Sequence, residues 1–208
     1  MKKRIQILCG ALFVSMLSIP AFSQPNDDPY LWLEEVESEK ALTWAKEQNA
    51  HSMAAWTEVK AFLDLQTQLR TILDSNQKIP YISKIGEHYY NFWRDEKNPR
   101  GLWRRTTLAR YRTENPEWET VLDLDALSTQ ENENWVWHGA TVLEPENRFC
   151  MLALSRGGAD ADVKREFDLH TKAFVNNGFF LPEAKSRFAW QGPDSAFVAT
   201  DFGPGSMT

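Results

Sequence analysis

Hydrophobic residues follow two different periods along the chain, and the change falls near Pro80. From Asp27 to Ser75 they recur at the three-and-four spacing of an amphipathic helix. A helix is expected to begin after Ser38, a favourable N-cap, and a second helix is expected after a break near His51. The predicted stripe runs through Leu42, Ala45, Asn49, Met53, Trp56, Val59, Phe62, Leu63, Leu69, Ile72 and Leu73. Such a stripe indicates a packing surface rather than a cofactor site.

After Pro80 the period is two, which is typical of β-strands with one buried face. Two strands are predicted between residues 87 and 111, a third between 117 and 127, three more between 134 and 169, and a hairpin between 188 and 203. The predicted turns lie at residues 98–101, 144–147, 156–158 and 192–194. Short strands joined by Gly, Pro and Asn turns indicate a sandwich, a barrel or a propeller. The predicted fold class is therefore α+β, with a helical segment followed by antiparallel sheets.

The first 23 residues have the pattern of a secretory signal peptide. Lys2, Lys3 and Arg4 precede an apolar run from Ile5 to Ile19, and the small residues Ala21 and Ser23 flank the expected cleavage site before Gln24. The apolar run is short for a membrane anchor. The exported chain is expected to be periplasmic or secreted, without a membrane association once the signal is removed.

The charge and the cysteine content limit which partners and which cysteine chemistry can be expected. Without residues 1–23 the chain has 20 basic and 29 acidic residues, a formal net charge of −9, which argues against nucleic acid and anionic membrane surfaces as partners. Cys9 lies in the predicted signal, so Cys150 is the one cysteine of the exported chain and no internal disulfide is expected. Between Phe149 and Met151, Cys150 is expected to be a buried apolar residue rather than a nucleophile.

The stretch "LALSRGGADADVKREFDL" has the letters of a serine-hydrolase site, because Ser155 lies two residues before Gly157. The nucleophile of an α/β-hydrolase lies in a G-x-S-x-G turn that leads from a strand into a helix. Here Ala153 replaces the first glycine, and the residues after Gly158 have a strand pattern with Val163 and Phe167 inward. The possible partners Asp160, Asp162, Asp168 and His170 all follow within fifteen residues. We therefore interpret Ser155 as a residue of a β-hairpin.

Other candidate sites are weaker still. His51, His88, His138 and His170 are each more than thirty residues apart and have no metal-ligand spacing, so no metal site is predicted. A pair of catalytic carboxylates remains open among 29 acidic residues, although most carboxylates are solvated. No glycine-rich phosphate loop is present, and no cofactor is expected.

Four longer stretches resemble one family of enzymes. They are "DDPYLWLEEVESEKALTWAKEQNA", "YYNFWRDEKNPRGLWRRTTLARY", "SRGGADADVKREFDL" and "GFFLPEAKSRFAW". The first resembles the opening of the prolyl oligopeptidase family of serine peptidases, and the others resemble hairpins of that family's β-propeller. The resemblance spans residues 28–208.

The resemblance implies a seven-bladed β-propeller that covers an α/β-hydrolase peptidase domain. After the signal peptide at residues 1–23, it divides the chain into an N-terminal helical segment at 24–78 and an incomplete propeller at 79–208. The family's catalytic Ser, Asp and His lie in the C-terminal peptidase domain, and no position of this sequence matches them. No catalytic, cofactor-binding or metal-binding residue is therefore assigned, and the chain is expected to be inactive alone.

Two functions follow as alternatives. In the first, the chain is the N-terminal portion of an exported serine oligopeptidase that hydrolyses short peptides, with the propeller as a substrate filter and the missing C-terminal peptidase domain as its partner. In the second, it is a non-catalytic, β-rich periplasmic binding module. Unpaired strand edges and uncovered apolar faces on an open propeller argue against the second.

Overall fold

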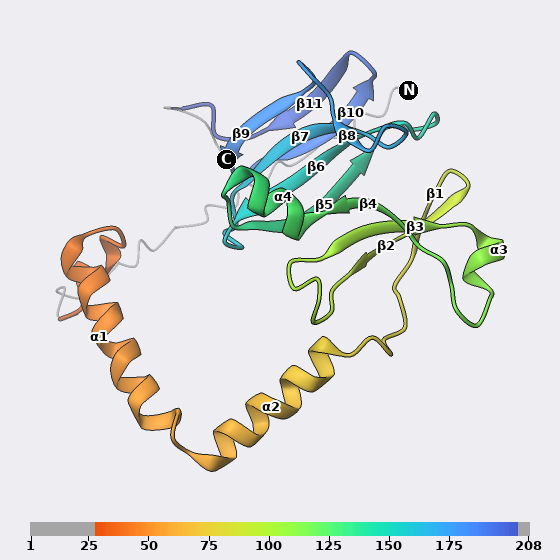
Figure 1. Cartoon of the computed structure of the whole chain (residues 1–208). Coiled ribbons are helices and arrows are strands. Elements are labelled where there is room, and N and C mark those ends of the chain that lie inside the picture. Colours follow the sequence, from red (N-terminus) through yellow and green to blue (C-terminus); the bar gives the residue numbers. More distant parts are fainter. Residues whose placement is uncertain (1–27, 204–208) are drawn as a thin grey trace, which may run out of the picture. The chain divides into compact units, whose positions relative to one another are not determined.

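The computed structural model describes residues 28–203, which form two compact units, 28–59 and 60–203. The predicted signal peptide at residues 1–23 lies outside the described residues. Within 28–203, no helix is both long and apolar enough to cross a bilayer. The order of elements is helical first and then antiparallel β-sheet, as the hydrophobic pattern predicts (Figure 1).

The first unit contains a short 3-10 helix, η1 (Leu31–Glu34), and α1 (Glu39–Trp56). Ser38 caps α1, because its side chain accepts a hydrogen bond from the backbone N–H of Ala41 at 3.2 Å. The predicted break near His51 is wrong. The residues around it include Ala and Met, which favour a helix, and no Gly or Pro. The helix instead ends at Trp56, and the hydroxyl of the C-cap residue Thr57 donates to the carbonyl oxygen of Met53 at 2.7 Å.

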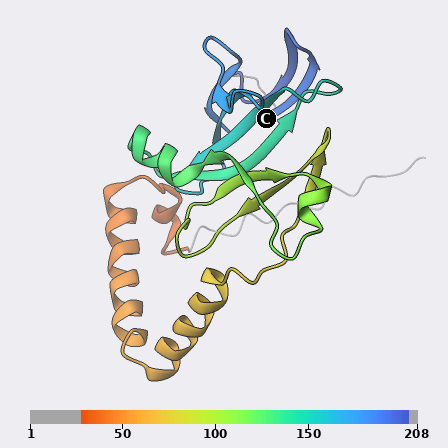
Figure 2. The same ribbon diagram turned by 45° about the vertical axis from the view of Figure 1, so that its right-hand side comes forward.

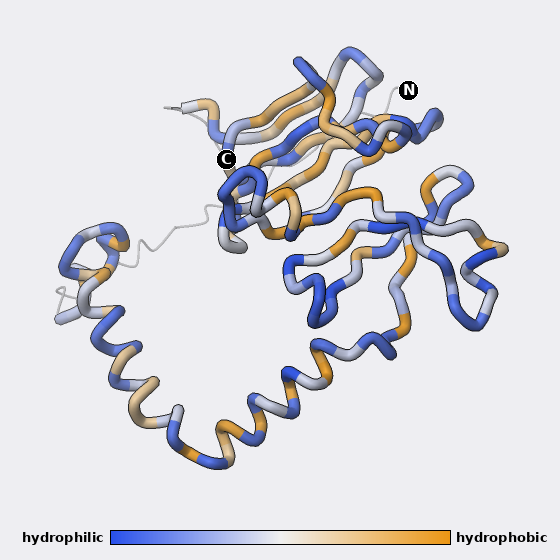
Figure 3. Tube along the Cα trace, in the orientation of Figure 1, coloured by the Kyte–Doolittle hydropathy of each residue, from blue (hydrophilic) through white to orange (hydrophobic). Residues whose placement is uncertain are grey.

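The second helix, α2 (Lys60–Asp74), has no buried residue, and only Ala41 is buried in α1. Apolar positions recur along both helices in Figure 3. Their exposed large side chains include Leu42, Met53, Trp56, Leu63, Leu65, Leu69, Ile72 and Leu73, with exposed fractions between 44% and 68%. An amphipathic helix obtains most of its stability from tertiary packing. On each helix the apolar side chains are therefore exposed and available for contact with another protein.

Lys78 connects α2 to the first sheet. Its ammonium donates to the carbonyl oxygen of Leu73 in α2 at 2.7 Å and to that of Arg94, just after strand β2, at 2.5 Å. The same ammonium lies 5.2 Å from the ring centre of Trp93. One side chain thus satisfies two backbone acceptors from different elements.

The first sheet is antiparallel in the order β1–β2–β3–β4. Its strands are β1 (Ser83–Ile85), β2 (His88–Trp93), β3 (Leu102–Thr106) and β4 (Glu119–Asp123). The predicted hairpin of β2 and β3 is confirmed, with Phe92 opposite Trp103. The expected continuation to residue 111 is wrong, because Thr107 caps the short helix α3 (Leu108–Tyr111) and accepts from the N–H of Arg110 at 3.4 Å.

The third predicted strand also ends earlier than expected. After Asp123 the chain forms the helix α4 (Leu124–Glu131). The Asp123 carboxylate caps this helix, because it accepts a hydrogen bond from the backbone N–H of Ala126 at 2.9 Å. Asn132 ends the helix in a left-handed conformation. Leu124 is therefore a buried helical residue rather than a strand residue.

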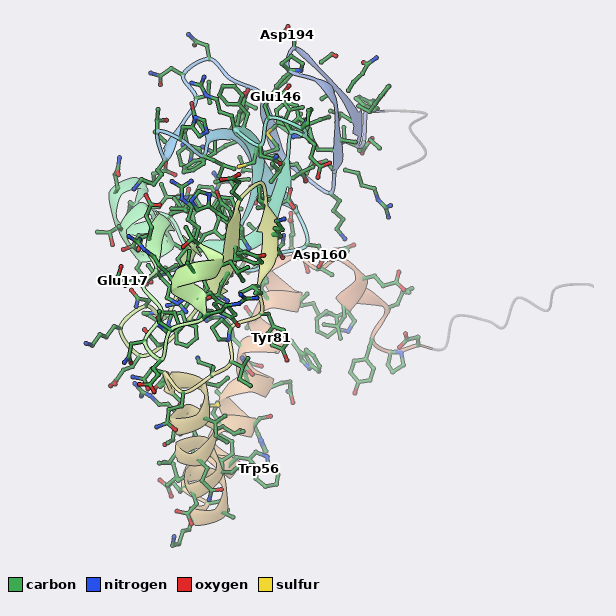
Figure 4. All side chains as sticks on the ribbon, turned by 90° about the vertical axis from the view of Figure 1, so that its right-hand side faces the viewer. Trp56, Tyr81, Glu117, Glu146, Asp160 and Asp194 are labelled. Carbon is green, nitrogen blue, oxygen red and sulfur yellow. The ribbon has the colours of Figure 1, made fainter. Side chains whose placement is uncertain are left out.

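The second sheet confirms the three predicted strands between residues 134 and 169. It contains β5 (Trp135–Val142), β6 (Phe149–Arg156), β7 (Asp162–Asp168), β8 (Ala173–Phe174) and β9 (Phe180–Ala184). The predicted last hairpin is β10 (Arg187–Gly192) paired with β11 (Ser195–Ala199). Figure 4 marks three turns by their labelled residues, Glu146 between β5 and β6, Asp160 between β6 and β7, and Asp194 between β10 and β11.

The main hydrophobic core lies between the first two sheets, which run side by side in Figure 2. It includes Tyr90, Trp103, Val121, Leu124, Trp135, Cys150, Leu152, Leu154, Val163 and Phe167. The ring of Trp103 lies 5.1 Å from that of Tyr90 in its own sheet and 5.0 Å from that of Trp137 in the second sheet. Deletion of a buried aromatic ring of this size costs about 3–5 kcal/mol. Large aromatic side chains therefore hold the two sheets together.

Gly101, in the turn between β2 and β3, is predicted not to tolerate a side chain. Its φ is +115°, and a Cβ there would lie 2.4 Å from Cζ of the Phe92 ring. Gly101→Ala should lower the free energy of unfolding by about 2–4 kcal/mol, since backbone strain adds to steric overlap. Urea titration followed by tryptophan fluorescence measures the loss.

Gly158→Ala is the matched control. Gly158 also has a positive φ, +84°, but its nearest atom to a Cβ is 3.9 Å away. Its loss should be the strain alone, about 1–2 kcal/mol. Equal losses in the two variants would show that the contact with Phe92 has no role.

Candidate functional site

Ser155 lies near the end of β6 and is fully buried. The next residues form a tight turn with Gly157 and Gly158 at φ +66° and +84°, and the chain returns as β7. The prediction of a strand rather than a helix after Gly158 is confirmed, and Val163 and Phe167 are buried as predicted. The Ser155 hydroxyl has no hydrogen-bond partner within the described part of the chain. This geometry lacks the exposed nucleophile of a hydrolase elbow.

The acidic neighbours of Ser155 take part in ion pairs and turns. Asp162 accepts from the buried ammonium of Lys164 and lies 3.4 Å from Nδ1 of His138. Lys164 also donates to the carbonyl oxygen and the hydroxyl of Ser186, both at 2.9 Å, and so ties β7 to the turn before β10. Asp160 pairs with Lys185 at 3.1 Å on the surface.

Asp168 organises the turn after β7. It accepts from the Arg148 guanidinium at 2.8 Å and from the backbone N–H of His170 at 2.7 Å. Burial favours a higher pKa for Asp168, but these hydrogen bonds outweigh it and hold the pKa below its ordinary value. Asp168 and the backbone of His170 are therefore hydrogen-bonded to each other within this turn, and neither forms a hydrogen bond with Ser155.

The remaining residues considered for chemistry lie apart. His51 is in α1, His88 in β2 and His138 in β5, and the described residues contain no group of three His, Cys, Asp or Glu side chains that could hold a metal ion. Cys150 is completely buried, and burial raises the pKa of its thiol well above the ordinary range. It is the apolar core residue that the sequence predicts.

A cavity of about 330 Å³ lies between the first two sheets. It is lined by β1, β2, β3 and β5, through Tyr81, Ser83, Ile85, Tyr90, Asn91, Phe92, Trp103, Trp137, Gly139 and Ala140. The rings of Phe92 and Trp137 are stacked across the two sheets, with centres 5.3 Å apart and planes 8° from parallel. We refer to this space as the inter-sheet cavity.

Several polar groups of the inter-sheet cavity are already paired. The Asn91 amide donates to the carbonyl oxygens of Tyr81 at 3.0 Å and Phe92 at 3.2 Å, and its oxygen accepts from Nε of Arg104 at 3.0 Å. The Tyr90 hydroxyl accepts from Arg105 at 3.2 Å. By contrast, the indole N–H groups of Trp103 and Trp137 form no hydrogen bond within residues 28–203. The cavity is therefore lined by aromatic rings and by polar side chains that are already hydrogen-bonded.

Arg104 holds Asn91, one of the residues that line this cavity. Its guanidinium lies 4.1 Å from the ring centre of Trp93 and 4.4 Å from that of Trp118. Burial lowers the pKa of Arg104 to about 10, and the nearby Asp95 carboxylate acts in the opposite direction. Arg104 is therefore a cation at neutral pH, and it orients Asn91 while it stacks on two indole rings.

A charged cluster links the two sheets at another point, and we call it the inter-sheet clasp. Arg105 of β3 donates to Glu119 of β4 at 2.7 Å and to the carbonyl oxygen of Leu169 beyond β7 at 2.9 Å. Lys172 donates to the second oxygen of Glu119 at 2.9 Å. The hydrogen bonds from Arg105 and Lys172 lower the pKa of Glu119 to about 2.

The residues of the cavity and the clasp are not recognisable in the sequence as groups. Their only local signal was the density of Trp, Tyr and Arg in β2 and β3. Aromatic residues in a strand are usually core residues. Their convergence with Trp137 and Gly139 depends on the approach of two sheets.

Comparison with known proteins identifies a family that the chain matches. Residues 21–202 match the family described as "Prolyl oligopeptidase, N-terminal beta-propeller domain". An uncharacterized peptidase of Sinorhizobium fredii is 38% identical over 188 residues, which are 89% of this chain and 26% of the relative. An uncharacterized peptidase of Rickettsia prowazekii is 35% identical over 149 residues, which are 71% of this chain and 20% of that protein.

A solved structure supports the same assignment. A post-proline cleaving enzyme from Rickettsia typhi matches 85% of this chain and 27% of its own length, with 32% identity and a TM-score of 0.77. The chain thus spans about a quarter of the length of the proteins that it resembles.

The inter-sheet clasp should make stability depend on pH in the acid range. The folded-state pKa of Glu119, about 2, is below its ordinary value of 4.5, so its contribution is complete above about pH 4.5 and is lost as the pH falls toward 2. Because Glu119 is 42% exposed, the contribution is expected to be no more than about 1 kcal/mol. Glu119→Gln should remove this part of the dependence, measured by urea titration between pH 2 and pH 6.

Glu146→Gln is the control, since Glu146 is exposed and forms none of the ion pairs seen among the described residues. It should leave the acid profile as in the unchanged protein. A profile that responds equally to both substitutions would assign the acid dependence to general charge rather than to the clasp.

Proposed function

The chain belongs to the prolyl oligopeptidase family, whose N-terminal β-propeller domain it matches, and on that premise we propose that it is the N-terminal portion of an exported serine-type oligopeptidase that hydrolyses short peptides. The observation that carries the proposal is the structural similarity to a post-proline cleaving enzyme over 85% of the chain. The curated relatives are peptidases as well.

In this proposal the chain supplies substrate selection, and the acyl-transfer chemistry belongs to the peptidase part of the longer protein. An oxyanion hole and an activated serine are the usual requirements of that chemistry. Ser155, buried and followed by a strand, is not the nucleophile. The blades of a propeller surround a central channel. A narrow channel would admit an extended peptide and exclude a folded protein, and this is how the propeller would filter substrates.

Export is the second part of the proposal. It rests on the basic start, the apolar run and the small residues before Gln24, a pattern typical of secretory signals. A compartment that oxidises thiols suits a chain whose only other cysteine, Cys150, is completely buried.

A chimera tests the peptidase assignment. Residues 28–203 replace the matching quarter of the Rickettsia typhi enzyme, and hydrolysis of a chromogenic proline-containing peptide is measured. The chimera is expected to cleave the peptide, because 32% identity and a TM-score of 0.77 indicate compatible packing surfaces. Ser155→Ala in the chimera should retain cleavage, whereas replacement of the nucleophilic serine of the Rickettsia portion should abolish it.

A chimera with a normal melting transition and no cleavage would contradict the assignment. A chimera that cleaves folded proteins as well as short peptides would contradict the substrate filter. Labelling of Ser155 by a fluorophosphonate in the 208-residue chain alone would contradict its placement as a hairpin residue.

Export is tested by expression of the whole chain in a Gram-negative bacterium, followed by separation of periplasm and cytoplasm. The chain is expected in the periplasm, with Gln24 as its first residue by N-terminal sequencing. A cytoplasmic chain that retains residues 1–23 would rule out this part of the proposal.

A further inference from the structure

The first unit contains a pocket that combines tryptophan rings with carboxylates. The pocket lies between η1 and α1, has a volume of about 500 Å³, and is lined by Trp32, Glu39, Lys40, Thr43, Trp44 and Glu47. The rings of Trp32 and Trp44 are perpendicular, with their centres 6.1 Å apart, and the ring of Tyr30 lies 6.2 Å from that of Trp44. We call this space the tryptophan pocket.

Local interactions are sufficient to form the tryptophan pocket. The Asp28 carboxylate accepts from the backbone N–H of Tyr30 at 2.8 Å, and the indole N–H of Trp32 donates to the carbonyl oxygen of Pro29 at 3.0 Å. On α1, residues three and four positions apart are neighbours on the helix surface, so Trp44 lies between Lys40 and Glu47. All the lining residues therefore come from one short stretch, residues 32–47.

The charges of the tryptophan pocket favour a further cation. The Lys40 ammonium lies 4.2 Å from the ring centre of Trp32, so one cation of the chain already lies on an indole of this pocket. Among the residues that the structure describes, the Glu39 and Glu47 carboxylates form no hydrogen bond and no ion pair. Two carboxylates and one ammonium leave one negative charge without a partner beside the rings.

The neighbouring ring and carboxylate of Trp44 and Glu47 suit a guanidinium group in particular. A guanidinium is planar, stacks on aromatic rings and forms two parallel hydrogen bonds with a carboxylate, whereas an ammonium is a more strongly hydrated point charge. We propose that the tryptophan pocket receives an arginine side chain from another part of the proposed longer protein. The proposal rests on the proposed function, because it takes this chain as one portion of a longer polypeptide.

A protein segment fits the surroundings of this pocket better than a free amino acid. The same helix exposes the large apolar side chains of Leu42, Met53 and Trp56, with exposed fractions of 47%, 55% and 59%. Apolar surface of this kind is covered by contact with other protein, but apolar contact is not directional. An ion pair between a guanidinium and Glu47 has a defined geometry. The arginine would therefore determine the position at which the segment lies along α1.

The chemistry of the pocket is tested on the 208-residue chain itself. The probe is N-acetyl-arginine amide, and N-acetyl-citrulline amide is the comparison compound, because it has nearly the same shape and no charge. The indole N–H resonances are followed by two-dimensional NMR. The arginine probe should shift those of Trp32 and Trp44 in a saturable manner. The citrulline probe should bind at least about tenfold more weakly, because its hydrogen bonds to a carboxylate are not charge-assisted on the donor side.

Two substitutions with opposite effects locate the binding in the tryptophan pocket. Glu47→Gln should weaken binding of the arginine probe about tenfold, because it removes the paired carboxylate. Lys40→Gln should strengthen binding about two- to threefold, because it removes a cation that competes for the same rings and carboxylates. Glu58→Gln is the matched control. Glu58 is exposed, lies outside the pocket between α1 and α2, and its substitution should leave binding unchanged.

The chimera with the Rickettsia typhi enzyme tests whether an arginine occupies the pocket in a longer protein. If it does, Glu47→Gln breaks an ion pair and should lower the melting temperature of the chimera by about 1–3 °C. If uncharged surface covers the pocket, Glu47 is buried without a partner and the same substitution raises the melting temperature. If nothing covers the pocket, the melting temperature is unchanged, as is expected for the 208-residue chain, in which Glu47 is exposed. The second and third results would each overturn the proposal.

Equal binding of the two probes to the chain, or unchanged binding in Glu47→Gln, would also overturn it. If the chimera does not fold, binding to the 208-residue chain and to its Glu47→Gln variant decides. The peptidase assignment is judged separately by cleavage. A chimera that cleaves the peptide and is not destabilised by Glu47→Gln refutes this inference alone. A folded chimera that is destabilised by Glu47→Gln and does not cleave refutes the peptidase assignment alone.

Discussion

The packing of aromatic rings between two antiparallel sheets is the interaction on which the second unit depends. Trp103 contacts rings on both sides of the junction, Tyr90 in its own sheet and Trp137 in the next, and Phe167 lies 6.4 Å away in the second sheet. A blade of four strands has two faces, and each apolar face must be covered by a neighbour. Large rings cover that area with few residues. The inter-sheet cavity lies beside two of these rings, Phe92 and Trp137.

Polar contacts determine how the two sheets are aligned. Arg105 reaches Glu119 in its own sheet and the Leu169 carbonyl oxygen beyond the second. Asp125 of α4 accepts from the backbone N–H groups of Arg100 and Gly101 at the turn between β2 and β3. Aromatic pairs tolerate several ring arrangements, whereas these hydrogen bonds have defined donors and acceptors. The combination explains how a junction made of rings can have a single alignment.

The sequence predicted the parts of the fold that depend on neighbouring residues. The strands from β2 to β7 and the hairpin of β10 and β11 follow from alternation and from turn residues, and the start of α1 follows from Ser38. The errors arise where two signals compete. Thr107 and Asp123 end strands because their side chains cap short helices. The same residue types also occur within strands and turns, so their capping role becomes evident only once the helix that follows is known.

The inter-sheet cavity was outside the reach of sequence reasoning for a different reason. Tyr81, Trp103 and Trp137 are far apart along the chain, and their common surface exists only after the sheets approach. The hydroxyl of Ser155 shows the reverse case. Its surroundings in the sequence resemble an active site, yet complete burial between strands leaves no path for a substrate.

The hydrogen bonds of Lys78 affect which residues of α2 and β2 can change in sequence. Both of its acceptors, at Leu73 and Arg94, are backbone carbonyl oxygens, which every amino acid provides. The side chains at positions 73 and 94 can therefore change without loss of the connection, whereas the ammonium at position 78 has no substitute of equal length. This connection therefore does not fix the side chains at positions 73 and 94, while one lysine joins α2 to the end of β2.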